Sequence, residues 1–128
     1  MSDEIREALN RFEAACQMSF GGALVNRTLK LTEALSANRN IHSSSQEAKF
    51  LSTIQSIFGE AEGERIAGLI YAFMIADAAG HGGNAVAEFE GLMEALAETH
   101  PDSAGVIRAY GSNKKSEHAD IAARFVTF

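Results

Sequence analysis

The stretch Ile66–Ala76 (IAGLIYAFMIA) decides the fold class of this chain. It holds 11 consecutive residues without a charged side chain, and Arg65 and Asp77 close it at its two ends. A helix that is apolar on every side is typical of one surrounded by other helices, whereas a membrane span needs about 20 such residues. The stretch therefore predicts a central core helix near 62–79 and no membrane anchor.

Apolar residues recur at spacings of three and four on both sides of this helix, which predicts further amphipathic helices. The first runs over residues 2–20, with Ser2 as its N-cap and Gly21 after its end. The other expected helices cover residues 23–38, 45–58, 84–99 (capped by Asn84) and, as short C-terminal helices, 103–110 (ended by Gly111) and 116–125. The prediction is one all-α domain over 1–128, a compact bundle of five main helices plus one or two short ones.

Composition excludes several classes of protein. The 128 residues are 46% hydrophobic and 22% charged, with one Pro and one Cys, as in an ordinary globular domain. The single cysteine, Cys16, lies on an apolar helix face, so we expect a small buried side chain and no disulfide. The first residues are acidic and are not followed by an apolar run behind a basic stretch, so we do not expect them to be a signal peptide and expect a cytoplasmic protein. No nucleotide-binding, zinc or serine-hydrolase motif is present, and we expect no cofactor and no metal site.

Acidic residues gather in the middle of the chain. The net charge is −6, and residues 40–104 hold ten acids against only Lys49 and Arg65. The fifth predicted helix carries acids without interleaved bases, and a second group precedes the core helix; together they are Glu88, Glu90, Glu94, Glu98, Glu60, Glu62 and Glu64. Such a stripe is compatible with the solvated face of an acidic protein. Because like charges four residues apart repel each other, it also indicates a docking surface for a basic partner protein. Direct binding of nucleic acid is disfavoured, since phosphates need a basic footprint.

Polar side chains near the end of the core helix are the second candidate site. Asp77 extends the apolar face of this helix, which would turn its side chain inward. The simplest expectation is nevertheless a partly exposed carboxylate that interacts with His81, four residues later, or with loop amides. With Tyr71, Asp77 and His81 form a predicted ligand pocket between helices. Two further His/carboxylate groups, at 100–102 and 117–120, lack a spacing that forces metal ligands to converge, and we expect them to be exposed.

Three functions are compatible with these observations. The first is an acidic protein-binding module, such as an inhibitor, immunity protein, antagonist or chaperone, that covers a basic surface of its partner without catalysis. The alternative is a helix-bundle protein that binds a small molecule near Tyr71, Asp77 and His81. The third is a metal-dependent or acid/base enzyme. A homodimer fits all three, and no membrane partner is expected.

Overall fold

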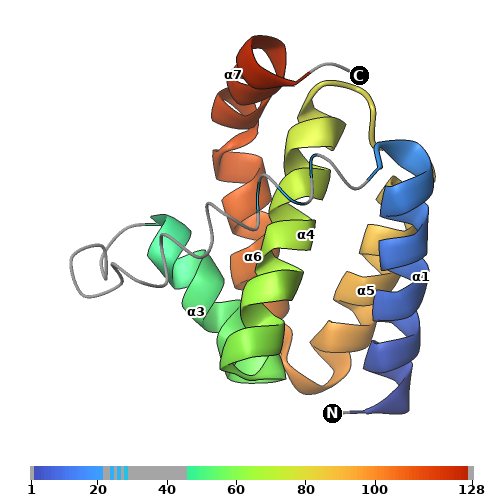
Figure 1. Ribbon diagram of the computed structural model, residues 1–128. Coiled ribbons are helices and arrows are strands. Elements are labelled where there is room, and N and C mark those ends of the chain that lie inside the picture. The colour runs from blue at the N-terminus through green and yellow to red at the C-terminus, as the bar shows by residue number, and fades with distance from the viewer. Residues whose placement is uncertain (1, 22–23, 25, 27, 29–45, 127–128) are drawn as a thin grey trace.

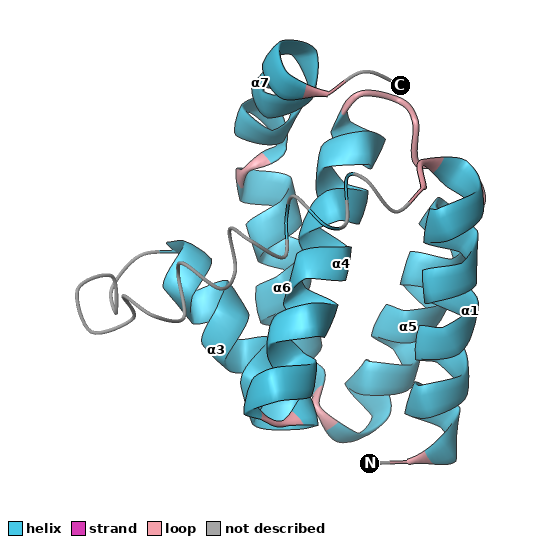
Figure 2. Ribbon diagram, viewed as in Figure 1, coloured by secondary structure: helices cyan, strands magenta, loops and turns pink. Residues whose placement is uncertain are grey.

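Helices make up the architecture in the computed structural model, which describes residues 2–21, 24, 26, 28 and 46–126 (Figures 1 and 2). In these residues it shows helices and no strand: α1 (Asp3–Ser19), α3 (Gln46–Phe58), α4 (Glu60–Ala78), α5 (Ala85–Thr99), α6 (Pro101–Asn113) and α7 (Lys115–Phe125). The predicted all-α bundle is confirmed. The helix expected over 23–38 falls outside the described residues, except for Leu24, Asn26 and Thr28, which are helical.

The apolar helix α4 occupies the centre of the bundle. It packs against α3 and α7 on one side and touches α1 on the other, while α5 lies between α1 and α6 (Figure 1). Eleven of its residues, from Gly63 to Ala76, are buried. The central core helix expected near 62–79 is therefore confirmed. None of the described helices is both long enough and apolar enough to cross a membrane.

The ends of α1 and α3 follow from local chemistry. At the start of α1, the Ile5 backbone N–H donates to Ser2 Oγ at 3.2 Å, so Ser2 is the predicted N-cap. After α3, Gly59 adopts a φ of 93°, a conformation that side chains with a Cβ rarely adopt, and the chain turns directly into α4. Near this turn α3 and α4 lie so close that a Cβ on Gly63 would meet Gln55 Cα at 2.5 Å. Glycine at position 63 allows this close crossing.

Two hydrophobic clusters hold the helices together. The larger one joins α1, α3, α4, α5 and α6, and at its centre Phe12 meets Phe73 edge-on while Phe73 stacks on Phe89, with ring centroids 5.3 and 4.8 Å apart. The smaller one lies where α7 packs on α4, and its buried members are Leu24, Ala72, Ile75, Ala76 and Ala122. The small alanines let α7 approach α4 closely.

The C-terminal third of the chain differs from the prediction. The helix expected to stop at Gly111 continues to Asn113, and α7 begins at Lys115, so the expected polar loop is a single junction residue, Lys114. Gly111 does not end the helix but allows α6 to pack closely on Met74 of α4. A Cβ at position 111 would lie 3.1 Å from Met74 Cε. Asn84 does occupy the N-cap position of α5, but its side chain makes no capping hydrogen bond, contrary to expectation.

Candidate functional site

His118 is the most unusual polar residue in the described part of the chain. It lies in α7, its side chain is only 2% exposed, and its Nε2 atom has no hydrogen-bond partner there. Its ring meets Tyr71 of α4 edge-on, with centroids 5.1 Å apart, and Tyr110 of α6 at 5.6 Å. Buried polar atoms are nearly always hydrogen-bonded, so an unpaired ring nitrogen at this depth marks a place with a special role.

The burial of His118 corrects the expectation that the 117–120 group is exposed. Glu117 and Asp120 are exposed, as expected, but His118 shares a helical face with Ile121 and Ala122, which pack on α4. This spacing of three and four was present in the sequence, and it would have indicated an inward histidine. We call His118, Tyr71 and Tyr110 the aromatic cluster.

Charged groups lie next to the aromatic cluster. Lys114 Nζ is 3.3 Å from Glu47 Oε1 and 3.2 Å from Glu117 Oε2, so one lysine bridges α3 and α7. Burial lowers the pKa of His118, and the lysine adds to this effect, while Glu117 and Glu47 act against it. Burial also raises the pKa values of Tyr71 and Tyr110. At neutral pH the aromatic cluster therefore consists of neutral rings beside a partly buried ion-pair network.

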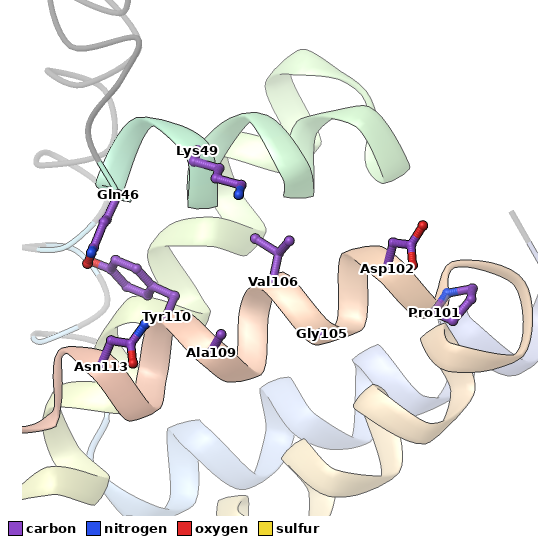
Figure 3. A pocket seen from close by; sticks show the side chains of 9 residues that line it. All are labelled: Gln46, Lys49, Pro101, Asp102, Gly105, Val106, Ala109, Tyr110 and Asn113. Carbon is purple, nitrogen blue, oxygen red and sulfur yellow. The ribbon is translucent and has the colours of Figure 1, made fainter.

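A cavity of about 460 Å³ adjoins the cluster between α3 and α6 (Figure 3). Tyr110 belongs to both, because it lines the cavity and its ring also stacks on Phe50 of α3 at 4.4 Å. In Figure 3, Val106 projects from α6 toward α3, and Lys49 extends from α3 into the same space. The whole lining is Gln46, Lys49, Pro101, Asp102, Gly105, Val106, Ala109, Tyr110 and Asn113.

The predicted pocket of Tyr71, Asp77 and His81 is not one site in the structure. Tyr71 lies in the aromatic cluster, whereas Asp77 and His81 are both exposed. Asp77 does not point inward, because α4 ends one residue later. Its exposed carboxylate lies beside the loop that follows, as in the simplest expectation: a Cβ on Gly82 would be 3.0 Å from Asp77 Oδ1. Asp77 instead lines a second, smaller cavity between α4, α5 and α6.

The predicted acidic docking surface is partly neutralised by arginines of the same chain. Arg11 Nε lies 3.5 Å from Glu88 Oε2, and Arg108 Nη1 lies 2.7 Å from Glu90 Oε2. In the other acidic group Glu62 pairs with Arg6, while Glu60 is exposed and Glu64 is half-buried. The sequence pattern missed these pairs because the arginines lie on α1 and α6, far away along the chain.

The other two acidic residues of α5, Glu94 and Glu98, form no salt bridge with an arginine of the described residues. A side-chain hydrogen bond with Glu4 of α1, together with the negative charge of Glu4, raises the pKa of the exposed Glu98 carboxyl group. The docking prediction therefore stays open at this end of α1 and α5.

No three histidine, cysteine, aspartate or glutamate side chains of the described residues converge closely enough to hold a metal ion. No protein-family model matches the chain, and neither a curated protein nor a solved structure is detectably similar to it.

Proposed function

We propose that this protein is a helical bundle that binds a small molecule in the cavity between α3 and α6. The observation that carries the proposal is the size and lining of this cavity. Its volume of about 460 Å³ falls within the range of about 300–1,000 Å³ that is usual for small-molecule sites. Such sites combine an apolar surface with a few polar groups that orient the ligand, and this cavity has both.

The lining divides into three parts along α6. Gly105, Val106 and Ala109 give the middle a small, apolar surface on which a flat ligand can approach the helix closely. The carboxamides of Gln46 and Asn113 lie at one end together with Tyr110, and all three can donate and accept hydrogen bonds. Asp102 supplies a negative charge at the other end, and Lys49 extends from α3 over the middle of the cavity (Figure 3).

This lining favours a planar ligand whose edge carries amide-like groups. Carboxamide side chains pair well with a donor and an acceptor that stand side by side on a ring. The apolar middle part accepts the face of that ring, because burying apolar area releases water from both surfaces. A heteroaromatic amide has both properties.

The aromatic cluster holds Tyr110 in a fixed position at one end of the cavity between α3 and α6. Tyr110 is stacked on Phe50 on one side and contacts Tyr71 and His118 on the other, so its ring has little freedom to turn. A binding group whose rotamer is already fixed loses less entropy when the ligand arrives. In this account His118 positions Tyr110 and does not touch the ligand.

The test is a thermal-shift screen of the whole protein against heteroaromatic amides, among them nicotinamide, hypoxanthine and uracil. We expect at least one compound to raise the Tm, because a ligand that binds only the folded state stabilises it. The variant Ala109→Phe fills the cavity from an exposed position and should abolish the shift. Ala14→Phe, on the exposed face of α1 and outside the cavity, is the matched control and should retain it. A shift that survives Ala109→Phe would contradict the proposal.

Docking of a basic partner protein is the second candidate, and the contact between Glu98 and Glu4 favours it. A fold gains nothing from two carboxylates in contact, whereas a basic partner would relieve their repulsion and be steered toward them. The direct test is affinity capture of binding partners with two variants. One carries both Glu94→Lys and Glu98→Lys on α5, and the control carries Asp120→Lys on α7. Loss of one stoichiometric partner with the α5 variant alone supports docking, and equal retention by both variants excludes it.

A further inference from the structure

A second cavity, of about 230 Å³, opens between α4, α5 and α6 and is independent of the site proposed above. Its buried lining is apolar: Phe73 of α4 and Phe89 of α5 stack on each other with centroids 4.8 Å apart, and Met74 lies beside them. Val86, one of the few large apolar side chains that the described residues expose, lies on its rim and is 42% exposed. The cavity thus has a nearly buried apolar floor and an exposed apolar side chain on its rim.

Four charged side chains stand on the rim, and two of them neutralise each other. Arg108 Nη1 donates to both carboxylate oxygens of Glu90, at 2.9 and 2.7 Å. Asp77 from α4 and Lys115 from α7 also line the cavity, and both are exposed. Neither forms a salt bridge in the described part of the chain, with each other or with any other side chain. One carboxylate and one ammonium group are therefore left available beside an aromatic floor.

Two glycines keep this space open. At Gly82 a Cβ would approach Asp77 Oδ1 to 3.0 Å and Val86 Cγ2 to 2.9 Å, so a larger residue there would displace both of these rim side chains. At Gly111, which belongs to the lining, a Cβ would press on Met74 Cε at 3.1 Å. Larger residues at either position would push into the floor or the rim.

We infer that this cavity binds a small zwitterion with an apolar side chain, that is, an apolar α-amino acid. Its ammonium group would pair with Asp77 and its carboxylate with Lys115, while its side chain covers Phe73 and Phe89. The volume supports this class of ligand, because about 230 Å³ lies below the range of drug-sized sites and suits a molecule with few atoms. Opposite charges on separate helices match a ligand that carries both signs on neighbouring atoms.

The experiment is a titration of the full chain with L-leucine, followed by NMR of the Met74 and Val86 methyl groups. We expect both signals to shift and saturate at millimolar leucine. Asp77→Asn and Lys115→Gln should each weaken binding about two- to fivefold, because an exposed ion pair contributes about 0.2–1 kcal/mol. The matched controls Asp102→Asn and Lys49→Gln remove the same charges from the other cavity and should leave leucine binding unchanged.

Two leucine derivatives separate the charge contributions. N-acetyl-leucine lacks the ammonium group, so its weaker binding should no longer respond to Asp77→Asn, and leucinamide should no longer respond to Lys115→Gln. Circular dichroism of each variant checks that the helices are intact. The inference is overturned if leucine shifts neither methyl signal, if the derivatives bind as well as leucine, or if the control variants lose as much affinity as the rim variants.

Discussion

The imidazole of His118 meets the ring of Tyr71 edge-on, with their centroids 5.1 Å apart and their planes at 82°. This arrangement directs the positive edge of one ring at the negative face of the other and stabilises aromatic pairs by about 0.5–1.5 kcal/mol. It also fixes α7 to α4 beside the smaller hydrophobic cluster. A titratable group thereby lies inside a helix–helix contact.

We predict that acid weakens the fold through His118. Burial lowers the pKa of this histidine below its ordinary value of 6.5, so below pH 6.5 the unfolded chain binds a proton that the folded chain does not. The contribution of the neutral ring is complete above that pH and is lost as the pH falls toward the folded-state pKa. Chemical denaturation between pH 5 and 8 measures this slope, and NMR of the imidazole gives the pKa directly.

The variant His118→Phe separates this effect from general acid denaturation. It keeps an aromatic ring against Tyr71 and Tyr110 but cannot take up a proton, so its stability should vary less between pH 5 and 6.5 than that of the natural protein. If both proteins lose stability equally over this interval, the protonation of His118 is not the cause.

The tight crossing of α3 and α4 predicts opposite effects for two glycine substitutions. Gly63→Ala would place a Cβ 2.5 Å from the Gln55 backbone, and overpacking of this kind costs about 1–3 kcal/mol. Gly91→Ala on α5 meets nothing within 4 Å, and the better helix propensity of alanine should stabilise by up to about 1 kcal/mol. Urea unfolding measures both, and a stable Gly63→Ala variant would contradict the close crossing.

The contact between Glu98 and Glu4 predicts that removing one charge raises stability. The pKa of Glu98 is raised, so its ionised form opposes folding once the pH exceeds the ordinary value of 4.5. Glu98→Gln should therefore raise the Tm at pH 7 and have little effect at pH 3, where the carboxyl group of the natural protein is protonated. A lower Tm at pH 7 would show that the two carboxylates do not repel.

Cys16 should react slowly with thiol reagents in the folded protein. Its side chain is fully buried in α1, and burial, with a smaller effect of Glu13, raises the pKa of the thiol to about 12. Because the thiolate is the reactive form, labelling at pH 8 should need local opening. The rates with and without denaturant test this, and rapid labelling of the folded chain would argue against its burial.

The helices of the fold could be predicted because their signals are local. The apolar stretch of α4, the cap at Ser2 and the end of the 45–58 helix each depend on neighbouring residues, and all three are confirmed. Gly111 was misread as a helix stop because a glycine that makes room for Met74 has the same sequence signature as one that ends a helix.

Little of the candidate site could be predicted, because it joins residues that are distant in the chain. Tyr71 was identified, but its partners Tyr110 and His118 come from α6 and α7, and only the packing of these helices brings the three rings together. The arginines that pair with Glu88 and Glu90 escaped prediction for the same reason. The apolar face of α4 did not reveal the exposure of Asp77, which lies one residue before the end of that helix and beside the loop that follows.

The most direct test of ligand binding between α3 and α6 is an intermolecular NOE experiment on the whole protein with nicotinamide. The account predicts cross-peaks from the nicotinamide ring to the methyl groups of Val106 and Ala109, and their loss in Ala109→Phe but not in Ala14→Phe. Cross-peaks only to methyl groups outside this cavity would contradict the proposal. So would the absence of cross-peaks both with saturating nicotinamide and with every other heteroaromatic amide of the screen.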